Sequence, residues 1–368
     1  MKIPYVNLTT QWEKERSKLL PIITKTLSRG SYVLGEEIKK FEKNIAKLCN
    51  VKYAVALNSG TDALTIGMYL LGVKKGDEVI TPPNSFISST SSIIHLGAKP
   101  IFADVLNNQN IDPKEVVKKI TKKTKAIMPV HLTGRVCNMK EILAISKKYK
   151  IPVIEDAAQS IGSMHYGKKS GSFGELGCFS AHPLKNLNAC GDAGFLVTNN
   201  SQIYKKAKVL RNHGLEDRNL VKNFGYISRM DVLQASILNY RLKRLNATIL
   251  KRRQNAKFYL KNINKEFYQL EDEKKFEYNT YHTFVIQTRK RNKLISYLKK
   301  NGIGTAIHYP IPIHLQPASK FLKYKKGDFP KTEIQSKKIL TIPIHQNLTK
   351  NQLKMIVFHL NKFAKTNS

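Results

Sequence analysis

A carboxylate and a lysine in one segment of the sequence have positions that suit covalent chemistry. Asp156 lies just past the apolar run 152–154, and Lys185 lies in a loop rich in small and turn-forming residues. A carboxylate at the carboxyl end of a buried strand lies where open α/β sheets bind their ligands. Most lysines are solvated surface cations, so Lys185 taken alone carries little weight. Its place between two apolar, strand-like runs separates it from the many lysines on expected helix surfaces.

A turn at the start of an expected helix offers a place for a phosphate group. Gly60 and Thr61 follow the strand-like run 54–57 and precede a helix that begins near Ala63. Backbone N–H groups at a helix N-terminus bind phosphate, and hydroxyl groups assist them. We therefore expect Gly60 and Thr61 to bind a phosphate with the help of Ser180.

The lysine, the carboxylate and the turn together match the needs of a pyridoxal phosphate site. The lysine would form a Schiff base with the cofactor. The carboxylate would keep the pyridine nitrogen protonated, so that the ring withdraws electrons from the substrate. The sequence therefore favours a pyridoxal phosphate site that contains Lys185, Asp156 and the turn at Gly60.

The elements that must position these residues follow an alternating pattern. From about residue 50, short apolar runs alternate with longer helical patterns, which is typical of an α/β fold on a mostly parallel sheet. The expected strands are 54–57, 78–81, 99–105, 126–130, 152–154 and 194–198. Besides the helix near Ala63, the expected helices are 87–96, 139–149 and 229–242.

The last third of the chain has a different character. It begins with a basic helical segment from Lys243, and its boundary with the preceding part lies near 240–255. The expected elements after it are a strand at 281–287 and helices at 294–301 and 350–362. We expect a large domain over residues 1–245, with the N-terminal segment, and a smaller C-terminal α/β domain over residues 246–368.

The charge of the chain is its most unusual bulk property. The 368 residues include 63 Lys and Arg against 26 Asp and Glu, a formal net charge of +37. Such an excess first suggests nucleic acid, an anionic membrane or a phosphorylated substrate. The lysines are scattered, however, whereas nucleic-acid binding favours a basic stripe with interleaved aromatic residues. We therefore expect no nucleic-acid partner.

The spacing of the cysteines and the length of the apolar runs limit the cellular locations that we expect for the protein. The four cysteines show no paired spacing, which predicts neither a metal site nor a disulfide framework. The first 20 residues lack the apolar run of a signal peptide, and no window approaches the roughly 18 apolar residues of a membrane span. We expect a cytoplasmic protein with no integral membrane association.

The sequence resembles the DegT/DnrJ/EryC1/StrS nucleotide-sugar aminotransferases, a family of fold type I pyridoxal phosphate enzymes in the aspartate aminotransferase superfamily. The resemblance covers nearly the whole chain. Its motifs are SYVLGEEIKKFE (31–42), NSGTDAL (58–64), GDEVITPPNSFISS (76–89), GAKPIFADV (97–105), VIEDAAQSIGS (153–163), CFSAHPLKNLNACGDAG (178–194), GYISRMDVLQASIL (225–238) and HYPIPIHLQPA (308–318). The resemblance implies a mostly parallel seven-stranded sheet flanked by helices in the large domain.

The resemblance also implies roles for residues around the cofactor. Lys185 would bind the cofactor covalently and move the proton between the substrate and the cofactor. Asp156 would pair with the pyridine nitrogen, and Gln159 would hydrogen-bond the phenolic oxygen. Phe86 would stack on the ring, although an aromatic residue before a helix is more often part of the core. The phosphate would be held by Gly60, Thr61 and Ser180.

For the substrate, the resemblance implies contacts from several further residues. His182, in the same loop as the lysine, would contact the sugar. His308 and Tyr309 would bind the sugar or the nucleotide diphosphate, although both could be packing residues. The resemblance places both of them, together with Arg229, on the partner subunit of a homodimer with shared active sites. His314 is a further candidate.

The chain departs from the family pattern at two positions. Many relatives have Asn where this chain has Ile227, and that Asn contacts the phosphate or the substrate across the dimer interface. Either Asn223 or Arg229 replaces it, or cofactor affinity is lower. Ala193 stands where relatives often have glycine, which is a mild change if its φ stays negative.

The implied reaction is a ping-pong transfer of the amino group of L-glutamate to a nucleotide-linked keto-sugar. The motif at 308–318 and the opening at 31–35 favour the C3 ketone of a UDP- or dTDP-linked sugar. The product would serve surface polysaccharide synthesis, such as lipopolysaccharide O-antigen. A C4-ketone substrate is an alternative, and a basic regulatory or nucleic-acid-binding protein on the same scaffold is another. Related sugar dehydratases have histidine in place of the lysine, so Lys185 argues against that reaction.

Overall fold

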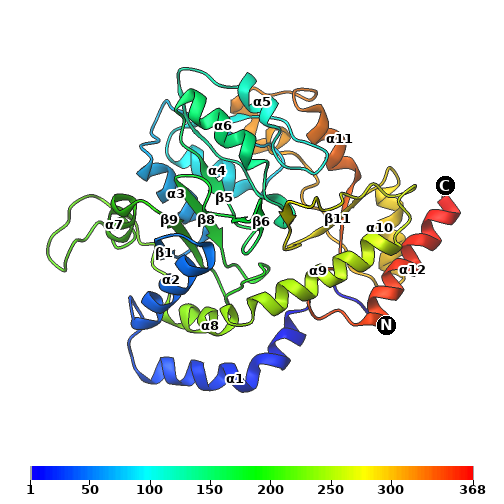
Figure 1. Cartoon of the computed structure of the whole chain (residues 1–368), viewed down its shortest axis with the longest axis horizontal. Helices are drawn as coiled ribbons and strands as arrows, with labels where there is room; N and C mark the ends of the chain where they lie inside the picture. Colours follow the sequence, from blue (N-terminus) through cyan, green and yellow to red (C-terminus); the bar gives the residue numbers. More distant parts are fainter. Residues whose placement is uncertain (1, 368) are drawn as a thin grey trace.

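The computed structural model describes residues 2–367 and contains one large central sheet. Figure 1 shows this sheet in the left and central part of the molecule, with helices around it. From one edge to the other, its strands are β1 (Tyr53–Leu57), β9 (Gly194–Thr198), β8 (Leu176–Ser180), β5 (Ile154–Asp156), β4 (Thr124–Ile127), β2 (Glu78–Thr81) and β3 (Lys99–Phe102).

The sheet consists of a four-stranded and a three-stranded part that continue into each other. Parallel bridges join Ile127 to Val153 and Val130 to Asp156, which places β5 beside β4. Within the sheet, β9 runs antiparallel to both of its neighbours, and the remaining neighbouring pairs are parallel. The prediction of a mostly parallel, seven-stranded sheet in an α/β fold is therefore confirmed.

Alternation along the strands explains how both faces of the sheet are covered. In β1, Ala54 and Ala56 belong to the core cluster that includes residues of α2 and α8, and Val55 and Leu57 belong to the cluster of α3 and α7. Successive side chains of a strand point to opposite faces, so an all-apolar run is buried on both sides. The helices of this part are α2 (Glu36–Cys49), α3 (Gly60–Leu70), α4 (Ile87–His95), α5 (Pro113–Lys118), α6 (Met139–Tyr149), α7 (Ser201–Leu210) and α8 (Val232–Leu242).

Most expected elements coincide with those of the structure to within a few residues. The predictions at 78–81, 139–149 and 194–198 match β2, α6 and β9 at both ends. The predicted strand at 99–105 is too long, because β3 ends at Phe102. The strand β8 is missing from the prediction, since its sequence LGCFS contains none of the β-branched residues that mark strands.

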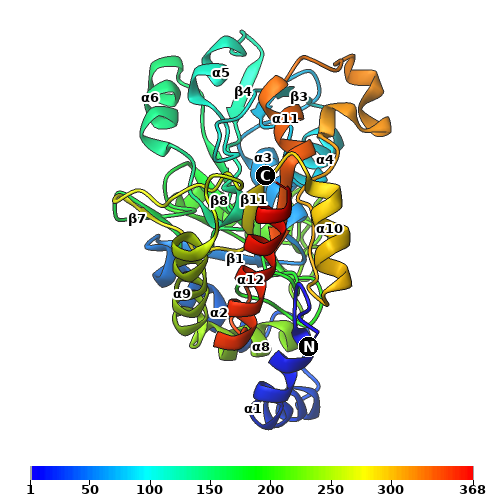
Figure 2. The same cartoon turned by 90° about the vertical axis from the view of Figure 1, so that its right-hand side faces the viewer.

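The C-terminal part has a core of its own. Figures 1 and 2 show α9 leading from α8 to a group formed by α10, β11 and α12. This core contains Tyr259, Leu294, Ile342 and Leu360, together with Ile3 from the N-terminal segment. The elements here are α9 (Leu245–Asn262), β11 (Phe284–Gln287), α10 (Arg291–Lys300), β12 (Ile339–Ile342) and α12 (Lys350–Asn367).

Several short elements connect the two parts. Phe329, just before α11 (Pro330–Lys338), packs edge-on against Phe102 of β3 at a centroid distance of 5.9 Å. A segment of the C-terminal part therefore returns to the sheet, and the division at residue 245/246 stays a prediction. The remaining short elements are β6 (Met164–His165), β7 (Lys168–Lys169), β10 (Glu277–Tyr278), η1 (Leu132–Gly134), η2 (Ile313–Leu315) and η3 (Pro317–Leu322).

The N-terminal helix α1 (Leu8–Ser28) packs against α8 through polar contacts. Arg241 and Glu15 form a buried ion pair with an N–O distance of 2.9 Å, and Thr26 donates a hydrogen bond to Ser236. Because each buried polar group has a partner, α1 adds to the fold without an apolar stripe. Within residues 2–367, no helix has both the length and the apolar character that crossing a membrane requires.

Candidate active site

The loops that follow β1, β2, β5 and β8 meet at one edge of the sheet, the edge formed by the carboxyl ends of its parallel strands. Because β9 is antiparallel, its first residue, Gly194, also lies at this edge, where it pairs with Leu57 and Ser180. A Cβ atom on Gly194 would lie 2.2 Å from the carbonyl carbon of Ser59. Glycine at this position therefore lets the turn before α3 approach the middle of the sheet.

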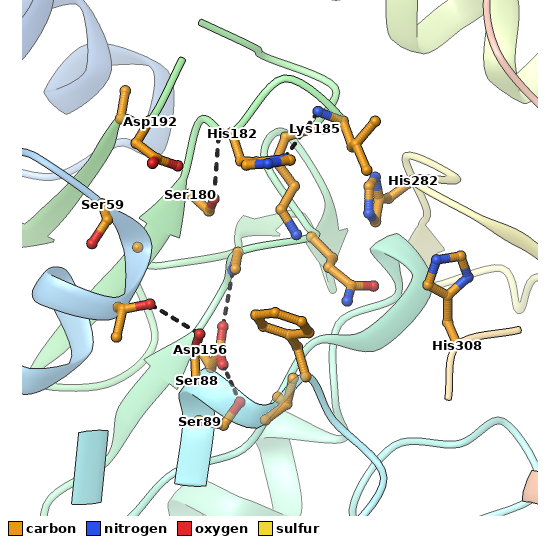
Figure 3. Close-up of a pocket in the computed structure, with 18 of the residues that line it drawn as sticks. Ser59, Ser88, Ser89, Asp156, Ser180, His182, Lys185, Asp192, His282 and His308 are labelled. Carbon is orange, nitrogen blue, oxygen red and sulfur yellow. Dashed lines mark hydrogen bonds between the residues drawn. The ribbon is translucent and has the colours of Figure 1, made fainter. Parts of the chain in front are cut away.

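A cavity of about 310 Å³ opens at this edge. Figure 3 shows Asp156, Ser88 and Ser89 grouped on one side, and Lys185, His182 and His282 on the other. The predicted site residues that line the cavity are Gly60, Thr61, Phe86, Asp156, Gln159, Ser180, His182, Lys185, His308 and Tyr309. Residues from five separate segments of the sequence thus converge on one space. His308 and Tyr309 lie in the cavity of their own chain, whereas the expectation placed them on a partner subunit.

Lys185 lies in a loop that is fastened to the rest of the protein at several points. Its backbone N–H donates to the carbonyl of His182 at 2.8 Å. The side chains of Asn186 and Asn188 donate to the carbonyls of Thr280 and Pro183. Burial lowers the pKa of Lys185 to about 8, and the charge of Asp156 opposes this shift. A fraction of this amine is therefore neutral, and so nucleophilic, near neutral pH.

Asp156 ends strand β5 and is buried. Its Oδ2 accepts a hydrogen bond from the Ser89 hydroxyl at 2.7 Å, and its Oδ1 accepts one from the Ala158 N–H at 3.2 Å. Burial raises the pKa of Asp156, while these hydrogen bonds and the charge of Lys185 lower it. A buried carboxylate held in this way suits a partner that carries a proton or a positive charge.

The first turn of α3 has the properties of a phosphate cradle. Ser59 caps the helix, and its hydroxyl accepts a hydrogen bond from the Asp62 N–H at 3.0 Å. The N–H groups of Gly60 and Thr61 have no acceptor within the helix, as at any helix start. A Cβ atom on Gly60 would lie 2.8 Å from Cβ of Ser180, so the two segments approach as closely as glycine allows.

Gln159 and Phe86 line the cavity and offer groups that suit a flat ring. The Gln159 Oε1 accepts a hydrogen bond from the Thr133 N–H at 2.9 Å, which leaves the amide nitrogen as a donor. Phe86 is 54% exposed and lies 5.8 Å from Tyr309 between ring centroids. Phe86 is therefore not a core residue, and its ring is available to a ligand.

Three residues discussed above lie away from the cavity, and a fourth, Ala193, lines it. Arg229 does not line the cavity, and it donates a hydrogen bond to Asn212 at 3.0 Å. His314 is also absent from the lining and pairs with Glu333. Ile227 is 64% exposed in the loop after α7, and Ala193 lines the cavity without a positive φ. The departure at Ala193 is therefore mild, as expected.

The structure adds cavity residues that the sequence analysis missed. Ser89 follows Phe86 by three positions, so helical spacing beyond Phe86 could have indicated it. Ser88 and Asp192 are close in sequence to Phe86 and Lys185, whereas the others lie far away. No local pattern distinguishes any of them from packing residues. These further lining residues include Tyr5, Ser88, Asp192, Arg252, His282 and His345.

This set of groups fits pyridoxal phosphate. The cradle supplies free N–H groups for the phosphate, and the buried carboxylate of Asp156 supplies a partner for a protonated ring nitrogen. Lys185 supplies an amine with a lowered pKa on the same cavity. Phe86 offers an exposed aromatic face. Each part of the cofactor has a matching group among these residues.

Comparison with known proteins gives the same assignment. The model of the DegT/DnrJ/EryC1/StrS aminotransferase family matches residues 13–361. A relative from Geobacillus stearothermophilus named pleiotropic regulatory protein is 36% identical, and the match covers 99% of each chain. A dTDP-3-amino-3,6-dideoxy-α-D-galactopyranose transaminase from Aneurinibacillus thermoaerophilus is 36% identical over 98% of this chain and 99% of its own.

A solved structure extends the match to three dimensions. The structure of NtdA from Bacillus subtilis with bound cofactor PMP has a TM-score of 0.93 and 32% sequence identity, over 99% of this chain and 85% of that one. The architecture is therefore that of the fold type I enzymes. The chain belongs to the DegT/DnrJ/EryC1/StrS aminotransferase family and is an aminotransferase that uses pyridoxal phosphate.

Proposed function

We propose that this enzyme transfers the amino group of L-glutamate to the C3 ketone of a sugar linked to UDP or dTDP. The observation that carries the proposal is that the half-buried Lys185 and the buried carboxylate of Asp156 line one cavity at the edge of the sheet. The dTDP-3-amino-sugar transaminase among the relatives supports position C3. The product would serve surface polysaccharides, such as lipopolysaccharide O-antigen, and the reaction would take place in the cytoplasm.

The residues that would hold the cofactor follow from the donors and acceptors around the cavity. Gly60, Thr61 and Ser180 would bind the phosphate. Gln159 would donate to the phenolic oxygen, because its Oε1 is already occupied by the Thr133 N–H. Phe86 would cover one face of the ring.

Asp156 and Lys185 would carry the proton chemistry. When bound, the cofactor carries the amino group from one substrate to the other and withdraws electrons from the substrate carbon. Asp156 would keep a proton on the ring nitrogen, since a buried carboxylate favours a cationic partner. Lys185 would take a proton from the substrate carbon at Nζ and return it, which its lowered pKa permits near neutral pH.

The substrate groups would come from the rim of the same cavity and from a second subunit. His182, His308 and Tyr309 line the cavity and would contact the sugar. Arg229 would reach a partner subunit's site in a homodimer. The loop after α7 supports this arrangement, because it projects from the body of the molecule (Figure 1) and Phe224 on it is 98% exposed. Exposed apolar side chains of this kind favour burial against another chain.

The two alternatives predict different behaviour. A C4-ketone substrate would use the same Lys185 and Asp156 and differ only in how the sugar is oriented. A regulatory role is favoured by the name of one relative. A regulator without chemistry, however, has no need for a buried amine whose pKa is lowered to about 8.

A substrate panel tests the proposal directly. The enzyme, loaded with pyridoxal phosphate, is mixed with L-glutamate and with UDP- or dTDP-linked sugars that carry the ketone at C3 or C4. Mass spectrometry detects the amino-sugar, and NMR gives the position of the nitrogen. We expect amination at C3. Amination only at C4 would replace the C3 proposal by its alternative, and no amination of any nucleotide sugar would refute both.

A further inference from the structure

Arg252 is a buried cation that has no carboxylate partner. In the described part of the chain, four arginines are each less than 10% exposed. Three of them pair with glutamates: Arg135, Arg211 and Arg241. Arg252 is 7% exposed, and no ion pair involves it among residues 2–367. An unpaired buried charge is costly, so its retention calls for an anion that is absent from the protein itself.

The hydrogen bonds of Arg252 leave part of its guanidinium group free. Nη1 donates to the carbonyls of Tyr281 and His282, each at 3.1 Å, which uses both of its hydrogens. Nε has no acceptor, and Nη2 forms no hydrogen bond within residues 2–367. The two bonds to carbonyls fix the direction of the side chain, while the remaining donors stay available.

Three more residues of the same cavity surround this guanidinium. Tyr5, His282 and His345 all line the cavity together with Arg252. The Nδ1 atoms of both histidines are buried and have no hydrogen-bond partner within residues 2–367, and burial lowers the pKa of each ring. The charge of Arg252 lowers these pKa values further, so both rings are neutral near pH 7. The positive charge of this group of residues is therefore that of Arg252.

This group lies close to the reacting lysine. The charges of Lys185 and Arg252 both act on the His282 ring, so His282 is near both cations. Figure 3 shows His282 on the same side of the cavity as Lys185. An anion bound at Arg252 would therefore share the cavity with the Lys185 amine.

We propose that Arg252, with Tyr5, His282 and His345 beside it, binds a carboxylate of the amino donor. The inference rests on the proposed function and deepens it, because it assigns the donor's binding site. The α-carboxylate of an amino acid is bonded to the carbon whose proton Lys185 moves, so a carboxylate must lie near this lysine. Arginine pairs with carboxylates through charge-assisted hydrogen bonds.

The chemistry of the group favours a carboxylate over the diphosphate of the second substrate. One guanidinium between two neutral imidazoles balances a single negative charge, whereas a diphosphate carries about two. Arg252 is also deeply buried, and the nucleoside attached to a diphosphate would have to share the cavity of about 310 Å³ with the cofactor. We therefore assign the diphosphate to other residues.

Separate measurement of the two half-reactions tests the assignment. The variants are Arg252→Gln, Arg252→Lys and, as a control, Lys257→Gln, which removes a positive charge from the exposed side of the same helix. In the first half-reaction, the pyridoxal form reacts with increasing L-glutamate, and the change in cofactor absorbance is followed. In the second, the pyridoxamine form reacts with the keto-sugar, and the apparent affinity for the sugar is measured.

We expect Arg252→Gln to weaken the apparent affinity for glutamate by about 10- to 100-fold, as loss of a hydrogen bond to a charged group implies. Arg252→Lys should fall between this variant and the wild type. The affinity for the keto-sugar should change by less than about threefold. Unchanged glutamate affinity in Arg252→Gln would overturn the inference, and so would an equal or larger loss of sugar affinity, which would assign Arg252 to the diphosphate.

A binding measurement covers the case in which Arg252→Gln folds poorly. Glutarate, a dicarboxylate without an amino group, should raise the melting temperature of the wild type and of Lys257→Gln but not that of Arg252→Gln. Tyr5→Phe, which leaves α9 intact, should lose about threefold in glutamate affinity. Equal stabilisation of all variants by glutarate refutes the carboxylate site. If the wild type does not react with glutamate at all, the proposed function itself fails.

Discussion

The Ser89 hydroxyl donates a hydrogen bond of 2.7 Å to Oδ2 of Asp156 and thereby joins the first turn of α4 to the end of β5. Burial raises the pKa of Asp156, and the bond from Ser89 is the largest influence that lowers it. Ser89 thus favours the ionised carboxylate that a protonated ring nitrogen requires. The residue stabilises one protonation state and also fixes the direction of the Asp156 side chain.

Replacement of Ser89 by alanine should lower kcat/KM by about tenfold. A hydrogen bond to a charged group contributes about 1.5–3 kcal/mol, and part of this stabilises the ionised carboxylate. The pKa of Asp156 should rise, so the acidic limb of the pH profile should move to higher pH. Ser91→Ala on the same helix is the control, because Ser91 bonds only to a backbone carbonyl. An unchanged pH profile in Ser89→Ala would contradict this role.

The capture of pyridoxal phosphate by the apoprotein should depend on pH through Lys185. Only the neutral amine attacks the cofactor, and the pKa of Lys185 is lowered to about 8 by burial. The capture rate, followed by absorbance, should rise about tenfold per pH unit below this value and level off above it. In Asp156→Asn the midpoint should move to lower pH, because the charge of Asp156 raises this pKa. A midpoint near the ordinary lysine value of 10.5 would show that the amine is not buried.

Gly60→Ala should weaken the binding of pyridoxal phosphate by at least about fivefold. Its Cβ would lie 2.8 Å from Cβ of Ser180, and relief of this contact must shift the first turn of α3 away from the phosphate position. Overpacking of this kind costs about 1–3 kcal/mol. The dissociation constant is measured by titration of the apoprotein.

Gly67→Ala is the matched control for that experiment. Gly67 lies on the same helix, and its added Cβ would meet the flexible end of Leu176 instead of the cavity. Gly67→Ala should change the melting temperature and leave the affinity for the cofactor within about twofold. Equal affinities in Gly60→Ala and the wild type would show that close approach of Gly60 to Ser180 is unnecessary.

Complementation between two inactive variants tests the shared active sites. Lys185→Ala should lose at least about 10³-fold in turnover, because in the proposed function one residue is both the nucleophile and the proton carrier. Arg229→Ala should lose about tenfold or more in nucleotide-sugar affinity. In a mixed dimer, the site that contains Lys185 would receive the intact Arg229 of the other chain.

A mixture of the two variants, refolded together, should therefore regain activity in the mixed species. Each variant refolded alone is the control. If Arg229 served the site of its own chain, every site in the mixed dimer would carry a defect, and no activity would return. Size-exclusion chromatography of the wild type gives the oligomeric state, and a fully active monomer would contradict the shared site.

Local sequence was sufficient for most of the expected elements and for several cavity residues. The alternation of apolar runs and helical patterns predicts the mostly parallel sheet, because a strand covered by helices on both faces must be apolar throughout. The carboxyl end of such a strand is where ligands bind, and that rule alone pointed to Asp156. Strand β8 was not predicted, since its sequence contains no β-branched residue that would mark it as a strand.

The tertiary structure, by contrast, decided which charged side chains are buried and which of them have a partner of opposite charge. Arg252 follows Lys251 and precedes Arg253 in a basic run, and nothing in that run marks the middle residue. Only the packing of α9 against the segment before β11 removes Arg252 from water and leaves it without a carboxylate, whereas Arg253 pairs with Glu273. The sequence by itself predicted the alternation of strands and helices and singled out Lys185 and Asp156 as candidate site residues. The fold decided which cations face the cavity, because a charge acquires a specific role only when desolvation and its neighbours distinguish it from its copies on the surface.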